Sequence, residues 1–255
     1  MDTYADVWKE VASLVDTYGA DLIWDFSDSL LSNMEWFDRF VASKPRLLNP
    51  LFYVYGRADE ITPECVEKLR SINTYQLLVG IETADAALKS YKGTSIAQDI
   101  RAAELLHENG IKLFPSFCLG MPGENAGSLS RTLDFARELC GRFRPDEIAS
   151  SILIPFPGSA AFRKMLRESQ WTKAQFACRD ILLPEDLQEE WVRNYCCRLD
   201  FDLLVRTVQE ILKLAPLKST FAAPTVDKRL PYMDEATRSQ LIYDYRYSDS
   251  EPKNE

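Results

Sequence analysis

Charged side chains follow apolar runs at several points of the chain, and these residues are the best candidates for chemistry. Glu82 comes directly after the run 77–81, and Arg57 follows the run 51–55 after a glycine. A carboxylate in such a place can accept hydrogen bonds from a ribose or an ammonium group, and a guanidinium suits a carboxylate or phosphate. Structural roles stay open for both residues: Glu82 could cap the next helix, and Arg57 could pair with an acid such as Asp59.

Asp25 lies near the end of another predicted strand, 20–26, and Ser27 and Asp28 follow that strand. Their carboxylates and hydroxyl could contact a ligand, although capping of the helix that follows is an equally open role. Two proline- and glycine-containing turns, 120–124 and 154–158, also follow apolar runs. The backbone of such turns can approach a flat ligand closely.

The elements that must position these residues alternate regularly. An apolar run that stops at turn residues predicts a buried strand, and apolar residues repeating every three to four positions predict a helix. Strands are predicted at 20–26, 51–55, 77–81, 112–119 and 149–154. Helices are predicted at 4–18, 34–42, 62–72, 95–109, 126–140 and 160–168. Gly141 is expected to end the helix at 126–140.

A helix after every strand implies parallel strands joined by right-handed crossovers. An open doubly wound sheet and a partial (β/α) barrel both satisfy this pattern. The barrel is favoured because no GxGxxG loop is present and because polar residues follow every strand. In a barrel those residues meet at one rim. The sequence thus predicts an α/β protein with a partial barrel of about five parallel strands at 1–170, a helical extension at 171–248 and a disordered tail at 249–255.

Composition narrows the function. The net charge of −9, from 39 acidic and 30 basic residues, disfavours a nucleic acid partner. A single histidine, His107, largely closes off catalytic triads and multi-histidine metal sites. The six cysteines form no CxxC pair, and we interpret them as reduced thiols rather than metal ligands. An acidic N-terminus and the lack of an apolar stretch of about 18 residues predict a cytoplasmic protein without a membrane span.

The motifs taken together resemble the radical S-adenosylmethionine (radical SAM) superfamily, in particular the group with cobalamin-dependent and methylthiotransferase-like members. The resemblance runs from about Tyr4 to Arg167. It rests on the order and spacing of Asp25-Phe26-Ser27-Asp28-Ser29, Gly56-Arg57-Ala58-Asp59, Gly80-Ile81-Glu82-Thr83, Lys92-Gly93-Thr94, Gly120-Met121-Pro122-Gly123-Glu124 and Ile154-Pro155-Phe156-Pro157-Gly158-Ser159.

The resemblance implies a partial barrel that binds S-adenosylmethionine (SAM). Glu82 and Arg57, with Thr83 beside them, are the implied contacts to the polar part of SAM, and the backbone at Gly120 and Ile154 would line the adenine. The acidic loop after the first strand of the chain, with Asp25, Ser27 and Asp28, would face cofactor or small-molecule substrate. The resemblance names no catalytic residue, and it allows cobalamin without a cobalamin-binding segment in these residues.

The family pattern is incomplete in one respect. Such enzymes hold a [4Fe–4S] cluster with a CxxxCxxC motif after a strand that would precede Tyr4, and this motif is absent from the sequence. Three explanations remain open: a fragment of a longer enzyme, one half of a split enzyme, or a cluster-free barrel. A missing strand would leave 22–26 as a sheet edge, where a partner chain or a missing segment could pair.

Two functions follow as hypotheses. The first is the core of a radical SAM enzyme, which cleaves SAM reductively and abstracts hydrogen from an unidentified substrate. The second is a non-catalytic protein that binds SAM or another small molecule, or acts as a scaffold. The sequence predicts no stoichiometric iron–sulfur cluster on this chain after anaerobic reconstitution, and a stable cluster on the chain alone would show that our interpretation of the cysteines is wrong.

Overall fold

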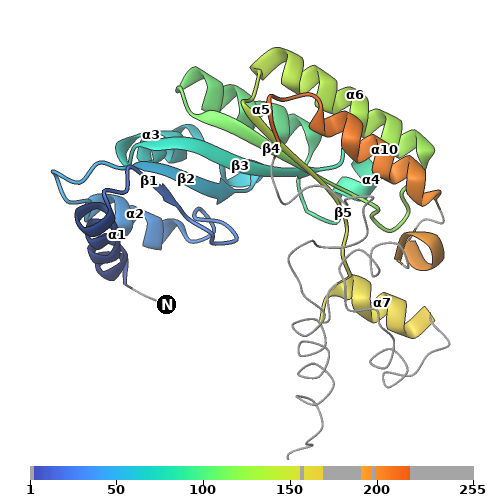
Figure 1. Cartoon of the computed structure of the whole chain (residues 1–255), viewed down its shortest axis with the longest axis horizontal. Coiled ribbons are helices and arrows are strands. Elements are labelled where there is room, and N and C mark those ends of the chain that lie inside the picture. Colours follow the sequence, from blue (N-terminus) through green and yellow to red (C-terminus); the bar gives the residue numbers. More distant parts are fainter. Residues whose placement is uncertain (1–2, 156–157, 169–190, 197–198, 219–255) are drawn as a thin grey trace, which may run out of the picture.

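The computed structural model describes residues 3–155, 158–168, 191–196 and 199–218 (Figure 1). Its strands form one parallel sheet in the order β1-β2-β3-β4-β5-β6, so neighbours in sequence are neighbours in space. The five longer strands curl strongly into a half-barrel, which confirms the predicted fold class. Their bounds are Leu22–Trp24 (β1), Leu51–Gly56 (β2), Thr74–Glu82 (β3), Lys112–Leu119 (β4), Glu147–Ile152 (β5) and Leu217–Lys218 (β6).

Helices lie between the strands and cover the outer face of the sheet (Figure 1). Local signals start them: Thr62 caps α3 with Pro63 at its first position, and Ser95 and Gln98 form a capping box at α5. The helices are α1 (Tyr4–Tyr18), α2 (Met34–Ala42), α3 (Pro63–Ser71), α4 (Ala86–Lys89), α5 (Ile96–Glu108), α6 (Ala126–Phe143), α7 (Ala160–Glu168) and α10 (Phe201–Leu212), with a 3₁₀ turn η1 (Ala58–Glu60) and a π-helical turn η2 (Val192–Cys196).

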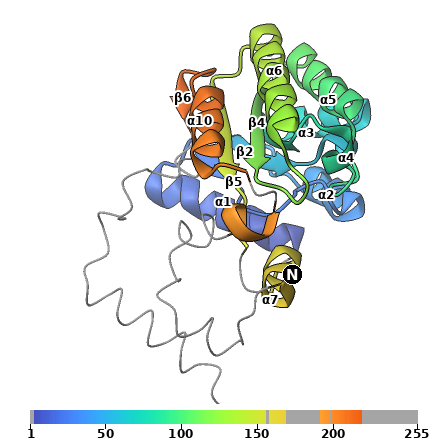
Figure 2. The same cartoon turned by 90° about the vertical axis from the view of Figure 1, so that its right-hand side faces the viewer.

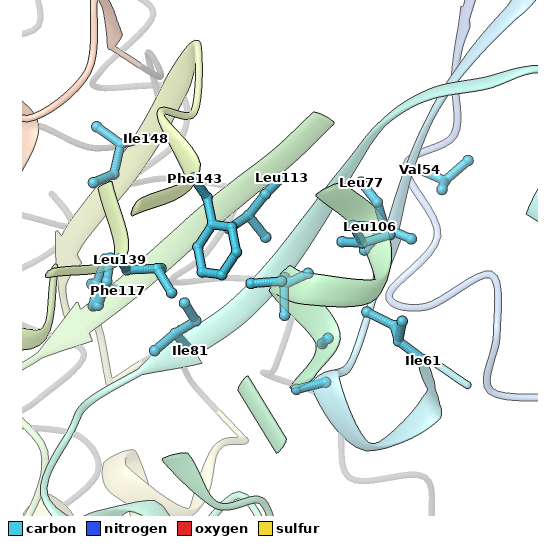
Figure 3. Close-up of a cluster of buried hydrophobic side chains, with 14 of the residues drawn as sticks. Val54, Ile61, Leu77, Ile81, Leu106, Leu113, Phe117, Leu139, Phe143 and Ile148 are labelled. Atoms are coloured by element: carbon cyan, nitrogen blue, oxygen red, sulfur yellow. The ribbon is translucent and has the colours of Figure 1, made fainter. Parts of the chain in front are cut away.

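The main hydrophobic core lies between the sheet and these helices (Figure 3). Alternate strand residues such as Leu77, Ile81 and Phe117 point toward Leu106 of α5 and Leu139 of α6, and all five are at most 2% exposed. Burial of this face fixes the register of each strand, because a slip by one residue would turn its apolar side chains away from the helices. The opposite, inner face carries the other half of the strand residues.

Several predicted boundaries are wrong in detail. The strand predicted at 20–26 is only Leu22–Trp24, since it pairs with β2 alone over three residues. The strand predicted at 77–81 begins earlier, at Thr74, and ends at Glu82, while the one predicted at 149–154 is Glu147–Ile152. The helix expected to end at Gly141 continues to Phe143, and its C-cap is Arg144 at φ +46°. A glycine weakens a helix but does not break it when packing continues.

The C-terminal part contains a strand that the sequence pattern did not predict. Helix α10 packs against β5 and α6 (Figure 2). The two-residue β6 then pairs in parallel with the start of β5, Glu147 opposite Leu217. A strand of two residues is too short for a periodic pattern.

The helical extension predicted at 171–248 lies largely outside the described residues, and the tail predicted at 249–255 lies wholly outside them. Within the described part of the chain, no helix combines the length and apolar character that a membrane crossing requires.

Candidate functional site

The candidate residues come together at the carboxyl-terminal rim of the sheet. Because β1 to β5 are parallel and adjacent, the segments that follow them lie along one edge. These segments carry Asp25, Arg57, Glu82, Gly120 and Ile154. The rim predicted from the sequence therefore exists in the structure.

Glu82 ends β3 in an unusual backbone conformation. Its φ is +64°, and the register with β4 shifts between Gly80 and Glu82, so the strand bulges at its end. The ammonium of Lys92 lies 2.5 Å from Glu82 Oε1 and 2.5 Å from the Gly80 carbonyl oxygen. A Cβ on Gly80 would overlap that ammonium, so the glycine leaves room for it. A carboxylate and a carbonyl thus form a seat for a cation, and the Glu82 side chain is 25% exposed.

Glu82 does not cap the next helix. That role falls to Asp85, whose carboxylate accepts from the backbone N–H groups of Ala87 and Leu88 at the start of α4. Asp85 also pairs with Arg131 of α6, and this pair holds its pKa below the usual range. The Glu82 carboxylate is therefore left to the rim.

Arg57 reaches the same place from β2. Its Nε and Nη2 donate to the two carboxylate oxygens of Asp59 at 3.0 and 3.1 Å, and Nη2 also donates to the Lys92 carbonyl at 2.9 Å. The Asp59 pairing raises the pKa of Arg57. Arg57 and Glu82 are thus joined through one residue, Lys92. The guanidinium side chain remains 37% exposed.

The loop after β1 is tied to the loop after β2. Asp25 accepts from the backbone N–H and the hydroxyl of Ser27, at 3.1 and 2.7 Å, and Asp28 is exposed. The carboxylate of Glu60 accepts from the Ser29 hydroxyl at 2.6 Å and from the Arg57 backbone N–H at 3.0 Å. Glu60 therefore fixes the acidic loop beside Arg57.

Thr83 and Lys89 act behind the rim, inside the protein. The Thr83 hydroxyl lies 3.1 Å from that of Thr132 in α6, and Thr83 is 1% exposed. Lys89 donates to the Ile81 carbonyl at 2.7 Å and lies 2.5 Å from Asp99 of α5. Burial is the main cause that lowers the pKa of Lys89 and raises that of Asp99. These contacts hold the bulged end of β3 against the helices.

The turn after β4 is held by a buried carboxylate and an indole. Glu124 accepts from the N–H groups of Gly120 and Met121 at 2.5 and 3.2 Å, and burial raises its pKa. Trp191 donates to the Gly120 carbonyl at 2.8 Å. Gly120 has φ +81°, and a Cβ there would lie 3.2 Å from Ile152, so the turn fits glycine. Ile154, half-buried, follows β5 next to this turn and packs on the core.

Sequence reasoning assigned no role to Lys92, Glu60, Lys89 or Asp99. Lys92 belongs to the motif Lys92-Gly93-Thr94 of the resemblance. Its position ten residues after Glu82 was the only feature of the sequence that could have suggested a contact between the two. The pairing of Lys89 with Asp99 depends on how α5 packs behind β3, for which the sequence carries no local signal.

The described residues do not provide ligands for a [4Fe–4S] cluster. Among them, no group of three or more His, Cys, Asp or Glu residues is arranged to hold a metal ion. Cys65, Cys118 and Cys140 are free thiols on different elements, and burial raises the pKa of all three. The set needed for such a cluster is three or four thiolates together.

No family model matches the chain, and no curated protein matches its sequence. Its structure is similar to TsrM from Kitasatospora setae, a radical SAM methyltransferase solved with cobalamin and a [4Fe–4S] cluster, with TM-score 0.59, 16% identity, and coverage of 95% of this chain and 54% of that one. TsrM with tryptophan and a SAM analogue matches at TM-score 0.55 and 16% identity, over 83% and 46% of the two chains.

A third similar structure is Elp3 from the archaeon Methanocaldococcus infernus, with TM-score 0.54, 13% identity, and coverage of 96% of this chain and 58% of that one. The chain thus spans about half the length of these proteins. At sequence identities this low, the structural similarity establishes the fold alone. The described part of the chain has the fold of a partial radical SAM barrel.

Proposed function

We propose that this chain is the SAM-binding core of a radical SAM enzyme. The observation that carries the proposal is the cation-binding group at the end of β3. There the Glu82 carboxylate and the Gly80 carbonyl each lie 2.5 Å from the ammonium of Lys92. SAM carries an ammonium, a carboxylate and two ribose hydroxyls, and a rim with an acid and an arginine suits these groups.

Each rim residue has a distinct part in the proposal. Glu82, steadied by Lys92, would accept hydrogen bonds from the ribose or the ammonium of SAM. Arg57 would attract the SAM carboxylate, with Asp59 holding its guanidinium in place. The turn at Gly120 and the backbone at Ile154 would border the adenine, and the loop with Asp25, Ser27 and Asp28 would face the substrate. Thr83 would support Glu82 from inside rather than contact the cofactor.

In radical SAM enzymes, bound SAM beside a reduced [4Fe–4S] cluster supplies hydrogen-atom abstraction from a substrate. The described residues do not fit that cluster. Our proposal therefore places the cluster ligands outside them, on a further segment or on a partner chain. Edge strand β1 is the proposed pairing site, since it is first in the sheet order and, among the described strands, pairs with β2 alone.

Calorimetry of SAM binding tests the proposed site. Glu82→Ala should raise the Kd of SAM about tenfold or more, because a charge-assisted hydrogen bond is worth roughly 1.5–3 kcal/mol. Glu67→Ala is the matched control, since this glutamate lies exposed on α3. Equal Kd values for wild type and Glu82→Ala would remove Glu82 from the site, and no SAM binding by wild type would overturn the proposal.

The second candidate function is a cluster-free protein that binds SAM or another small molecule without radical chemistry. The observation in its favour is the same lack of a metal-holding group among the described residues. Anaerobic reconstitution of the chain together with a candidate partner or further segment, followed by an iron count, separates the two. One cluster per chain would reject this second function, whereas SAM binding without iron, alone or with a candidate partner, would support it.

A further inference from the structure

Helices α1 and α2 lie together at the β1 end of the sheet (Figure 1), and residues of both line a cavity of about 410 Å³. This volume is within the range of small-molecule sites in proteins. The loop after β1, with Asp25 and Ser27, forms part of the wall, whereas Glu82 and Arg57 do not border the cavity. The cavity is therefore a different place from the proposed SAM contacts, although it adjoins the loop that the proposed function assigns to the substrate.

Stacked aromatic rings fix the two helices that flank the cavity. Phe40 of α2 stacks on Trp8 of α1 and on Trp36, with ring centroids 4.5 and 5.2 Å apart. The Trp8 indole N–H also donates to the Phe40 carbonyl at 2.8 Å, so α1 is joined to α2 and the space beside them is preformed. The rings of Trp24 and Phe26 border the cavity too, but they make further contacts. We therefore assign the aromatic contact of a ligand to Trp36, which is half-buried in the cavity wall.

The inner surface of the cavity is apolar. Val7, Val11 and Leu14 line it from one face of α1, where they follow each other at helical spacing, and Ile23 and Phe52 line it from the sheet. Val11 is buried, but Val7 and Leu14 on the same face are only half-buried. Part of this apolar face thus remains in contact with water, and the apolar body of a ligand would gain free energy by covering it.

The charges around the cavity select a cation. Two carboxylates border it, Glu10 of α1 and Asp25 after β1, and among the described residues that line it there is no Lys, Arg or His. The lysine next to Glu10 pairs with Asp6 instead, at 2.9 Å. Asp25 accepts only from the N–H and hydroxyl of Ser27, neither of which neutralises its charge. An ammonium is attracted by these carboxylates and by the face of an indole, whereas an anion is repelled.

We propose that the cavity between α1 and α2 binds an organic amine with a flat apolar body. The body lies against Leu14 and Trp36, and the ammonium lies toward Glu10 and Asp25. This inference deepens the proposed function, on which it rests only for the role of the amine as a substrate. The cavity, its apolar lining and its charge do not depend on SAM, so the two can be tested apart.

Equilibrium dialysis of the whole chain against 1-naphthylmethylamine, without SAM, tests the inference. The amine should bind saturably, while 1-naphthoate, an anion with the same ring system, should bind about tenfold more weakly. Leu14→Trp should weaken the amine at least about fivefold by filling the cavity, whereas Ser13→Trp puts the same ring on an exposed position of α1 outside it. Glu10→Gln should weaken the amine about threefold, and Asp16→Asn, an exposed acid of α1 that does not border the cavity, is its matched control.

The inference is overturned if the amine does not bind, if 1-naphthoate binds equally well, or if either variant behaves like its control. Circular dichroism of each variant shows whether the fold is kept, and Glu10→Gln provides the test if Leu14→Trp unfolds. Amine binding by a chain that does not bind SAM would uphold the cavity site and reject the proposed function. SAM binding without amine binding would reject the cavity site alone.

Discussion

Two lysines three residues apart, Lys89 and Lys92, make the same kinds of contact in opposite surroundings. Each donates to a carbonyl at the end of β3, Ile81 for Lys89 and Gly80 for Lys92. Each also lies 2.5 Å from an acid. The side chains of the Lys89–Asp99 pair are 1% and 0% exposed, whereas those of Lys92–Glu82 are 17% and 25% exposed.

This difference teaches that burial, rather than residue type, decides which of the two ion pairs can only stabilise the fold and which can also meet a ligand. A fully buried pair has lost its water and cannot exchange a partner without leaving a bare charge inside the protein. A pair at the rim keeps part of its hydration, so a ligand can share its carboxylate. Lys89 therefore fixes the end of β3, and Lys92 lies at the rim, where we propose that the cofactor binds.

The largest expected effect comes from breaking the buried pair. Lys89→Met should lower the free energy of unfolding by about 3–5 kcal/mol, because Asp99 remains as an uncompensated buried charge. Lys92→Met is the matched control and should cost at most about 1 kcal/mol. Urea unfolding followed by circular dichroism measures both. Similar losses in the two variants would erase the contrast between the pairs.

Cysteine reactivity tests the effect of burial on ionisable groups that belong to no ion pair. Burial raises the pKa of Cys65 and Cys140 each to about 11. Since only the thiolate reacts, alkylation at pH 8 should be roughly a hundredfold slower in the folded than in the unfolded protein, and it should accelerate as the pH rises toward 11. Mass spectrometry of iodoacetamide-treated peptides follows each thiol. Rapid labelling of either cysteine at pH 8 would show that this core opens readily.

The smallest expected change in stability comes from a substitution at the rim, next to the Lys92–Glu82 pair. Gly80→Ala places a methyl group where the Lys92 ammonium lies, so it should displace that ammonium from Glu82. Stability should change by less than about 1 kcal/mol, while the Kd of SAM should rise several-fold because Glu82 loses its support. In Gly141→Ala, where an added Cβ has open space, SAM binding should be unchanged. Unchanged binding in Gly80→Ala would separate Lys92 from the ligand site.

Much of the fold follows from local pattern. The strand at Lys112–Leu119 and the helices at Met34–Ala42 and Ala160–Glu168 have the predicted bounds. Their apolar periodicity and end signals are strong within a few residues. Errors occur where neighbours decide: β1 is short because only β2 pairs with it, and β6 exists because the start of β5 offers a free edge.

The order of βα units and the residues after each strand were determined by the sequence alone, since parallel strands bring their carboxyl ends to one rim whatever the side chains are. Only the tertiary structure decided which charges at that rim face outward. Lys89 and Lys92 look alike in the sequence, and it is the packing of Asp99 in α5 against the back of β3 that buries one of them. Burial is a property of the assembled layers, so no local pattern reports it.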